Sequence, residues 1–200
     1  MNYLAFDTSG THLTVTAKCD SGEFTYFSED CGLKHSVVLM DAIERVLAQA
    51  NLKKEDVDVF CCCVGPGSFT GIRIGVATAK GLAYALNKKV LGVTAFDVLA
   101  YDKTGDVMAV VDAKHSHVYA EGVRGGNIAY PHAYVATEEL KKEDGYVFVS
   151  SSEIEGLATE KADLANGLIK AVEANTCRAT YDIESLVPLY IRKSQAEEGL

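Results

Sequence analysis

The sequence predicts an α/β protein in which two related lobes are each built from a mixed sheet flanked by helices. Along the 200 residues, β-prone apolar segments alternate with segments of helical period. Residues 4–15 and 109–120 both contain a strand, an acidic turn and a second strand, and this weak repeat superposes Asp7 on Asp112. An ancient duplication would explain the repeat and would leave a cleft between the lobes. Two unrelated hairpins with an acidic turn would also look this similar.

Three strands and an amphipathic helix are predicted at the start of the chain. Segments 3–6, 13–17 and 24–27 are apolar or alternate between apolar and polar residues, and polar turns separate them, which indicates a meander. Residues 35–50 place their apolar side chains in one stripe about 120° wide on a helical wheel. We therefore expect this helix to bury one face.

A buried strand and an unusually apolar helix follow. Residues 57–64 are apolar apart from one aspartate, which predicts a buried strand, and the glycine-rich segment 65–71 leads into a helix at 72–86. That helix is apolar on nearly every side, so it needs cover on two of them. Small residues recur at every fourth position and would let another backbone approach closely. They form two rows, Gly71, Gly75, Ala79 and Ala83, and Ala77, Gly81 and Ala85.

The second half of the chain predicts a further lobe. The polar segment 103–106 contains turn-forming residues and marks the boundary, which gives an N-terminal lobe at 1–102 and a smaller C-terminal lobe at 103–200. The last residues of the second lobe could pack back on the first. The sequence Arg124-Gly125-Gly126-Asn127 predicts a hairpin turn. The remaining expected elements are strands at 89–93, 107–112, 118–123, 128–135 and 146–150, and helices at 95–101, 137–142, 152–155 and 160–175.

Charge and composition restrict the function. The net charge is −9, and Lys and Arg are not clustered, so we do not expect the chain alone to bind nucleic acid, although a basic partner could supply that surface. No apolar run is long enough to span a membrane, and no basic segment precedes the first apolar residues. None of the six cysteines has C-x-x-C spacing. These features predict a cytoplasmic protein with reduced thiols and no metal site.

Two segments carry candidate chemistry. An acidic turn ends the first strand, and a glycine-rich loop precedes a helix; backbone N–H groups in both could hold a phosphate, and the aspartate could position a metal-bound nucleotide. The loop lacks the Gly-Lys of a Walker A motif. A capped polar turn and tight strand-to-helix packing would explain the same residues. The candidate nucleotide- or phosphate-binding residues are Asp7, Thr8, Ser9, Gly65, Gly67, Ser68 and Gly71. We identify no catalytic residue.

Several segments, in their order and spacing over about residues 1–120, resemble a known bacterial family. They are Asp7-Thr8-Ser9, His35-Ser36, Gly65-Pro66-Gly67-Ser68-Phe69-Thr70-Gly71-Ile72-Arg73-Ile74-Gly75 and Asp112-Ala113-Lys114, with Pro188-Leu189-Tyr190-Ile191-Arg192 near the C-terminus. The family is TsaB, formerly YeaZ, of the glycoprotease-like ASKHA superfamily. The long glycine-rich segment is the most specific of these similarities.

This resemblance implies an actin/Hsp70/sugar-kinase-like (ribonuclease H-like) fold. It implies a non-catalytic subunit that binds and activates TsaD, the paralogue that makes N6-threonylcarbamoyladenosine at position 37 of tRNA. TsaE would dock on this pair, TsaC would act in the same pathway, tRNA would be reached only through the complex, and the chain alone would form a homodimer. No cofactor would be required, although ATP or ADP could lie at the complex interface. The two metal-binding histidines of TsaD correspond to Ala95 and Leu99, which cannot bind a metal.

The resemblance also implies that the chain pairs with TsaD through the first two long helices of the N-terminal lobe, here 35–50 and 72–86. The residues predicted at this interface are His35, Leu39, Ile43, Leu47, Gly75, Ala79 and Ala83. Gly75→Leu or Ala79→Glu would then abolish pairing without unfolding the chain. The alternative function is an ATP-dependent phosphotransferase of the same fold, in which Asp7 and Asp112 hold Mg–ATP. Its only candidate adenosine loop is the glycine pair already assigned to a hairpin turn.

Overall fold

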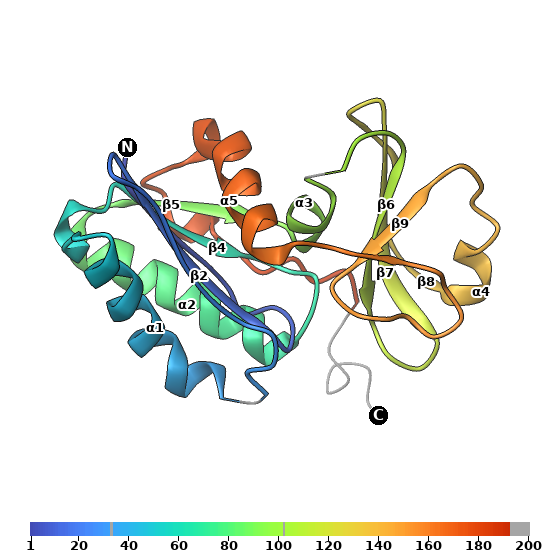
Figure 1. Ribbon diagram of the computed structural model, residues 1–200, viewed down its shortest axis with the longest axis horizontal. Coiled ribbons are helices and arrows are strands. Elements are labelled where there is room, and N and C mark those ends of the chain that lie inside the picture. The colour runs from blue at the N-terminus through green and yellow to red at the C-terminus, as the bar shows by residue number, and fades with distance from the viewer. Residues whose placement is uncertain (33, 102, 193–200) are drawn as a thin grey trace.

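The computed structural model describes residues 1–32, 34–101 and 103–192, which form two five-stranded sheets (Figure 1). The strand order of the first sheet is β3-β2-β1-β4-β5. Its first three strands are antiparallel, whereas β4 and β5 run parallel to β1. The strands are β1 (Tyr3–Asp7), β2 (Leu13–Cys19), β3 (Gly22–Ser28), β4 (Val59–Cys63) and β5 (Lys89–Val93).

The second sheet repeats this plan with the order β10-β9-β6-β7-β8. Again the three strands that come first in the chain, β6, β7 and β8, are antiparallel, and β9 and β10 run parallel to β6. Asp7 ends β1 and Asp112 ends β6, so the repeat seen in the sequence marks equivalent positions. The prediction of two related lobes is confirmed. The strands are β6 (Val107–Asp112), β7 (His117–Arg124), β8 (Asn127–Ala136), β9 (Val147–Ser150) and β10 (Glu160–Lys161).

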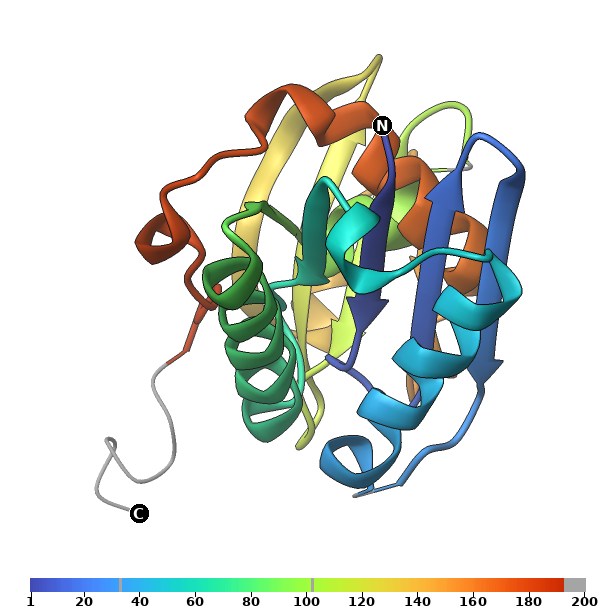
Figure 2. The same ribbon diagram turned by 90° about the vertical axis from the view of Figure 1, so that its left-hand side faces the viewer.

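Helices cover both faces of the first sheet. The helices α1 and α2 lie side by side on one face, and α5 lies on the other (Figures 1 and 2). Within the described residues, no helix combines the length and hydropathy needed to cross a membrane. The α-helices are α1 (His35–Gln49), α2 (Phe69–Leu86), α3 (Ala95–Ala100), α4 (Thr137–Leu140) and α5 (Leu164–Asn175), and the 3-10 helices are η1 (Lys54–Asp56), η2 (Thr176–Arg178) and η3 (Ile183–Ser185).

The two lobes share part of their hydrophobic core. Alternate residues of β1 point to opposite faces, so Leu4 and Phe6 pack under α1 and α2, whereas Tyr3 and Ala5 face α5. The cluster on the α5 side also contains side chains of α3 and of the second sheet, including Val149. The lobes are therefore held against each other by apolar contacts.

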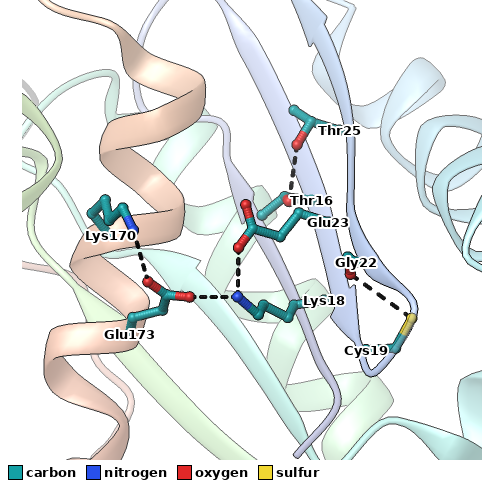
Figure 3. Close-up of polar contacts among 8 residues, drawn as sticks. All are labelled: Thr16, Lys18, Cys19, Gly22, Glu23, Thr25, Lys170 and Glu173. Carbon is teal, nitrogen blue, oxygen red and sulfur yellow. Dashed lines mark hydrogen bonds and ion pairs between the residues drawn. The ribbon is translucent and has the colours of Figure 1, made fainter.

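The helix α5 follows the second sheet in the chain but packs on the first. Its Glu173 accepts a hydrogen bond from Lys18 of β2 at 2.8 Å and another from Lys170, and Lys18 also contacts Glu23 of β3 (Figure 3). The predicted division at residues 102 and 103 stays a prediction. The last residues of the chain, 193–200, which were expected to pack back on the first lobe, lie outside the described residues.

Three expectations for the second half are decided by local hydrogen bonds. The helix expected at 152–155 is wrong, because this segment bends and forms only a bridge between Ile154 and Leu157. The helix expected from residue 160 begins at Leu164, because the Asp163 side chain caps it by accepting the Asn166 N–H. The hairpin turn is confirmed, with φ values of 54° and 80° at its two glycines.

The close contact between α3 and α5 predicts that adding a methyl group at Gly167 of α5 will destabilise the fold. A Cβ on Gly167 would lie 2.1 Å from the Val98 carbonyl oxygen, so Gly167→Ala should lower the free energy of unfolding by about 1–3 kcal/mol or more. At Gly81, in the middle of α2, a Cβ would meet no described atom within 4 Å, so Gly81→Ala should stabilise by up to about 1 kcal/mol. Urea unfolding followed by circular dichroism measures both. Equal stabilities for Gly167→Ala and the wild type would contradict this packing.

Candidate functional site

The turn after β1 packs directly against the glycine-rich loop before α2. Thr8 Oγ1 donates to the Gly71 carbonyl at 2.7 Å, and the Ser68 N–H donates to the Ser9 carbonyl at 2.6 Å. A Cβ on Gly67 would lie 2.3 Å from the Ser9 carbonyl oxygen, and one on Gly71 would lie 2.0 Å from that of Thr8. Glycine is needed at both positions because the chain's own backbone comes this close.

All seven candidate phosphate-binding residues are therefore brought together, but they contact one another. The Ser68 side chain caps α2 by accepting the Gly71 N–H at 3.2 Å. The Ile72 N–H donates to the Ser68 carbonyl, and a Cβ on Gly65 would meet the Ile72 side chain. These contacts favour the tight-packing explanation of the loop, and phosphate binding there stays a prediction.

A buried Asp–His pair holds the same turn. His12 Nε2 lies 3.1 Å from Asp7 Oδ2, and the Ser9 N–H donates to Asp7 Oδ1 at 2.8 Å. The side chains of Asp7 and His12 are nearly inaccessible to solvent. His35 Nε2–H donates to the His12 carbonyl at 2.8 Å, which ties the start of α1 to this turn. The pair was not predicted from the sequence. Its only signal was the spacing of five residues across a tight turn.

Each partner of the pair favours the charged form of the other and offsets the cost of burying it. Burial by itself would raise the pKa of Asp7, but the His12 imidazolium and hydrogen bonds from His12 and Ser9 lower it to about 2. Burial would lower the pKa of His12, but the Asp7 carboxylate raises it above its ordinary value. Both oxygens of the carboxylate are therefore occupied by partners in the same turn.

A narrow cleft separates this turn from the second lobe. Beside Asp7 and His12 lies a cavity of about 30 Å³, which has room for about one water molecule. Next to it a wider opening of about 180 Å³ is lined by His12, Thr11 and residues at the start of α5. The ion pair between Glu29 and Lys161 joins the two sides of this opening.

The residues predicted at the partner interface lie inside the chain. His35, Leu39, Ile43, Leu47, Gly75, Ala79 and Ala83 are all buried between the two helices and the first sheet. A Cβ on Gly75 would lie 2.7 Å from Thr8 Oγ1. Gly75→Leu and Ala79→Glu would therefore disturb the fold itself, so they cannot test pairing as the sequence suggested. That these helices pair with a partner stays a prediction.

The outward face of the same helices exposes several apolar side chains. Val37 and Met40 of α1 are 70% and 45% exposed, and Tyr84 of α2 is 77% exposed. The second row of small residues in α2, Ala77, Gly81 and Ala85, is also exposed. A partner helix would meet these residues rather than the buried row.

The Asp7–His12 pair predicts how stability depends on pH. Asp7→Asn leaves the buried imidazolium without its partner and should lower the free energy of unfolding by about 3–5 kcal/mol. The folded-state pKa of Asp7 is lowered, so the wild type should lose the contribution of the pair as the pH falls from about 4 toward 2. The folded-state pKa of His12 is raised, so the contribution should also be lost as the pH rises above about 6.5.

Chemical unfolding at about pH 3, 5.5 and 8.5 measures this dependence. Asp112→Asn is the control, because Asp112 pairs with the exposed Lys114 and should contribute at most about 1 kcal/mol. The explanation fails if the difference between Asp7→Asn and the wild type is no larger at pH 5.5 than at the other two values.

Comparison with known proteins identifies similar chains. A family model described as "TsaD: tRNA N6-adenosine threonylcarbamoyltransferase" matches residues 29–141. The tRNA threonylcarbamoyladenosine biosynthesis protein TsaB of Haemophilus influenzae is 33% identical over 124 residues, which cover 60% of this chain and 52% of that protein. The TsaB protein of Escherichia coli is 31% identical over 124 residues, covering 60% and 53%. The matches thus span about half the length of these relatives.

A solved structure supports the fold over nearly the whole chain. YeaZ from Pseudomonas aeruginosa superposes with a TM-score of 0.75 at 22% sequence identity, covering 94% of this chain and 99% of that one. A second structure from the same organism, described as similar to peptidase YEAZ, gives a TM-score of 0.78 at 22% identity and covers 96% and 99%. The predicted two-lobed α/β fold is confirmed.

Proposed function

The chain belongs to the tRNA N6-adenosine threonylcarbamoyltransferase (TsaD) family, with TsaB and YeaZ proteins among its relatives, and we propose that it serves as the TsaB-like subunit in this tRNA modification. In this proposal the chain is not the catalyst. It binds TsaD and activates it for the formation of N6-threonylcarbamoyladenosine.

The exposed apolar face of α1 and α2 carries this proposal. Val37 and Met40 at the start of α1, and Tyr84 near the end of α2, leave large apolar side chains in solvent. The small residues Gly81 and Ala85 lie near Tyr84 in α2 and allow a partner backbone to come close. A helix pair of TsaD would cover this face, with Tyr84 as an aromatic anchor. Without TsaD, a second copy of the chain would cover it.

The site residues favour an accessory role over phosphotransfer. Ala95 and Leu99, at the positions that the resemblance assigns to metal-binding histidines, are apolar and buried. Asp7 is already bonded to Ser9 and His12, and Asp112 accepts both the backbone N–H and the ammonium group of Lys114. Neither carboxylate is therefore arranged to receive a metal-bound nucleotide. The ATP-dependent phosphotransferase gains no support from these contacts.

The remaining parts of the assembly follow from the same proposal. TsaE docks on the pair of this chain with TsaD, and TsaC acts in the same pathway. ATP or ADP lies at the interface of the complex rather than being a cofactor that this chain requires. A tRNA substrate implies a cytoplasmic location, and the complex brings the tRNA to the chain.

Pairing predicts the effect of substitutions on the exposed face. Gly81→Glu places a charged side chain where a partner backbone would approach, and Tyr84→Ala removes the aromatic anchor, so each should weaken association with TsaD by about tenfold or more. Both positions are exposed, so the thermal unfolding of the chain should change little. Co-purification with TsaD, followed by a threonylcarbamoyl-transfer assay on tRNA with TsaE and TsaC present, measures the effect.

Ile128→Glu is the matched control, because Ile128 is 63% exposed on β8 in the other lobe. It should pair and activate like the wild type. If Gly81→Glu and Tyr84→Ala also behave like the wild type, the interface is wrong. If the wild type neither binds TsaD nor stimulates transfer, the proposed function is wrong.

A further inference from the structure

Aromatic and basic side chains from distant segments meet at the N-terminal end of α2, one turn before the exposed Ala77. The Arg73 guanidinium lies 3.8 Å from the centroid of the Phe69 ring. The rings of Phe69 and Tyr190 stack with their centroids 4.7 Å apart, and Arg73 Nε donates to the Tyr190 hydroxyl at 2.9 Å. The segment that contains Tyr190 is thereby fixed to the first turn of α2.

A second group of rings faces the same region from the second sheet. Tyr134 of β8 stacks on His117 with centroids 4.7 Å apart, and the Tyr119 ring lies 5.7 Å away. Arg192 donates to the Tyr134 hydroxyl at 2.9 Å, and its guanidinium lies 5.0 Å from the ring centroid. Arg192 thus links the C-terminal segment to the second lobe as Tyr190 links it to the first.

A groove of about 340 Å³ lies between the two groups. Phe69, Tyr119, Tyr190 and Arg192 line it, together with the Pro66-Gly67 segment. This volume is within the range of pockets that hold small organic ligands. Arg73 does not line the groove itself but lies over the Phe69 ring, which does. Among the described residues, the outer nitrogens of Arg73 have no acceptor, and this side chain is exposed. The groove therefore offers aromatic faces beside positive charge.

We propose that this groove binds an unpaired nucleotide of RNA. Aromatic rings and guanidinium groups recognise bases that are free of a duplex by stacking and cation–π contact, and the guanidinium also meets the phosphate. Because the chain carries a net charge of −9, its general field repels RNA, so binding depends on these local contacts. The inference extends the proposed function by giving the accessory chain its own contact with the RNA that the complex modifies.

Binding of a labelled single-stranded RNA hexamer to the isolated full chain, followed by fluorescence anisotropy at about 50 mM salt, tests the proposal. Tyr190→Ala should weaken binding by about 5- to 100-fold, because one base loses its stacking surface. Arg73→Gln should weaken binding and make it less dependent on salt. Tyr181→Ala is the matched control: Tyr181 is 64% exposed and its ring centroid lies 5.4 Å from the Lys89 ammonium. Unlike Arg73, it contacts neither Phe69 nor Tyr190 among the described residues, and it does not line the groove. It should bind like the wild type.

Other outcomes overturn the proposal. If AMP competes with an affinity equal to that of the hexamer, the groove is a site for free nucleotides. If an RNA duplex binds as well as the hexamer, or if Tyr190→Ala and Arg73→Gln both bind like the wild type, the groove does not read unpaired bases. Pairing with TsaD is measured separately on the same variants and should be unchanged. If the chain pairs with TsaD but does not bind the hexamer, the RNA-binding proposal is wrong and the proposed function stands. If the chain binds the hexamer but does not pair with TsaD, the proposed function is wrong and the RNA-binding groove stands.

Discussion

The backbone contact between the turn after β1 and the loop before α2 joins the first sheet to the N-terminal end of α2. Two carbonyl groups, of Thr8 and Ser9, approach Gly71 and Gly67 so closely that neither glycine could carry a side chain. The contact fixes the N-terminal end of α2 against the first sheet. The buried pair of Asp7 and His12 holds the same turn, and the hydrogen bond from His35 to the His12 carbonyl connects this turn to the start of α1. This contact and the apolar cluster beneath both helices together set their orientation on the sheet.

The two helices bury one face and leave further apolar and small residues in solvent. Each helix buries one stripe against its own sheet, so residues such as Leu39 and Ala79 are unavailable to a partner. The helix α2 has a second face of small residues that nothing within the described part of the chain covers. Burial of such a face is favourable in proportion to its apolar area, which is the physical basis of the pairing proposed for this surface.

The two lobes have the same topology and are joined by a shared apolar cluster. The helices α3 and α5 place apolar side chains between the sheets, and Val149 of the second sheet belongs to the same cluster as Tyr3 of the first. The C-terminal segment adds a second connection, because Tyr190 stacks on α2 and Arg192 bonds to β8. The groove lined by these two residues therefore lies where the two lobes meet.

Local patterns in the sequence determined most elements of this protein. The alternation in β2, the apolar stripe of α1 and the glycine pair of the β7–β8 turn each reflect one local preference, so they could be predicted without the fold. The repeated acidic turn even indicated two lobes of one plan. Local periodicity also marked both small-residue rows of α2, but it could not tell which row the sheet would bury. That choice depends on Thr8 lying against Gly75, a contact between residues far apart in the chain. The Asp7–His12 pair and the Phe69–Tyr190 stack were decided in the same way, because only the tertiary structure sets which distant side chains meet.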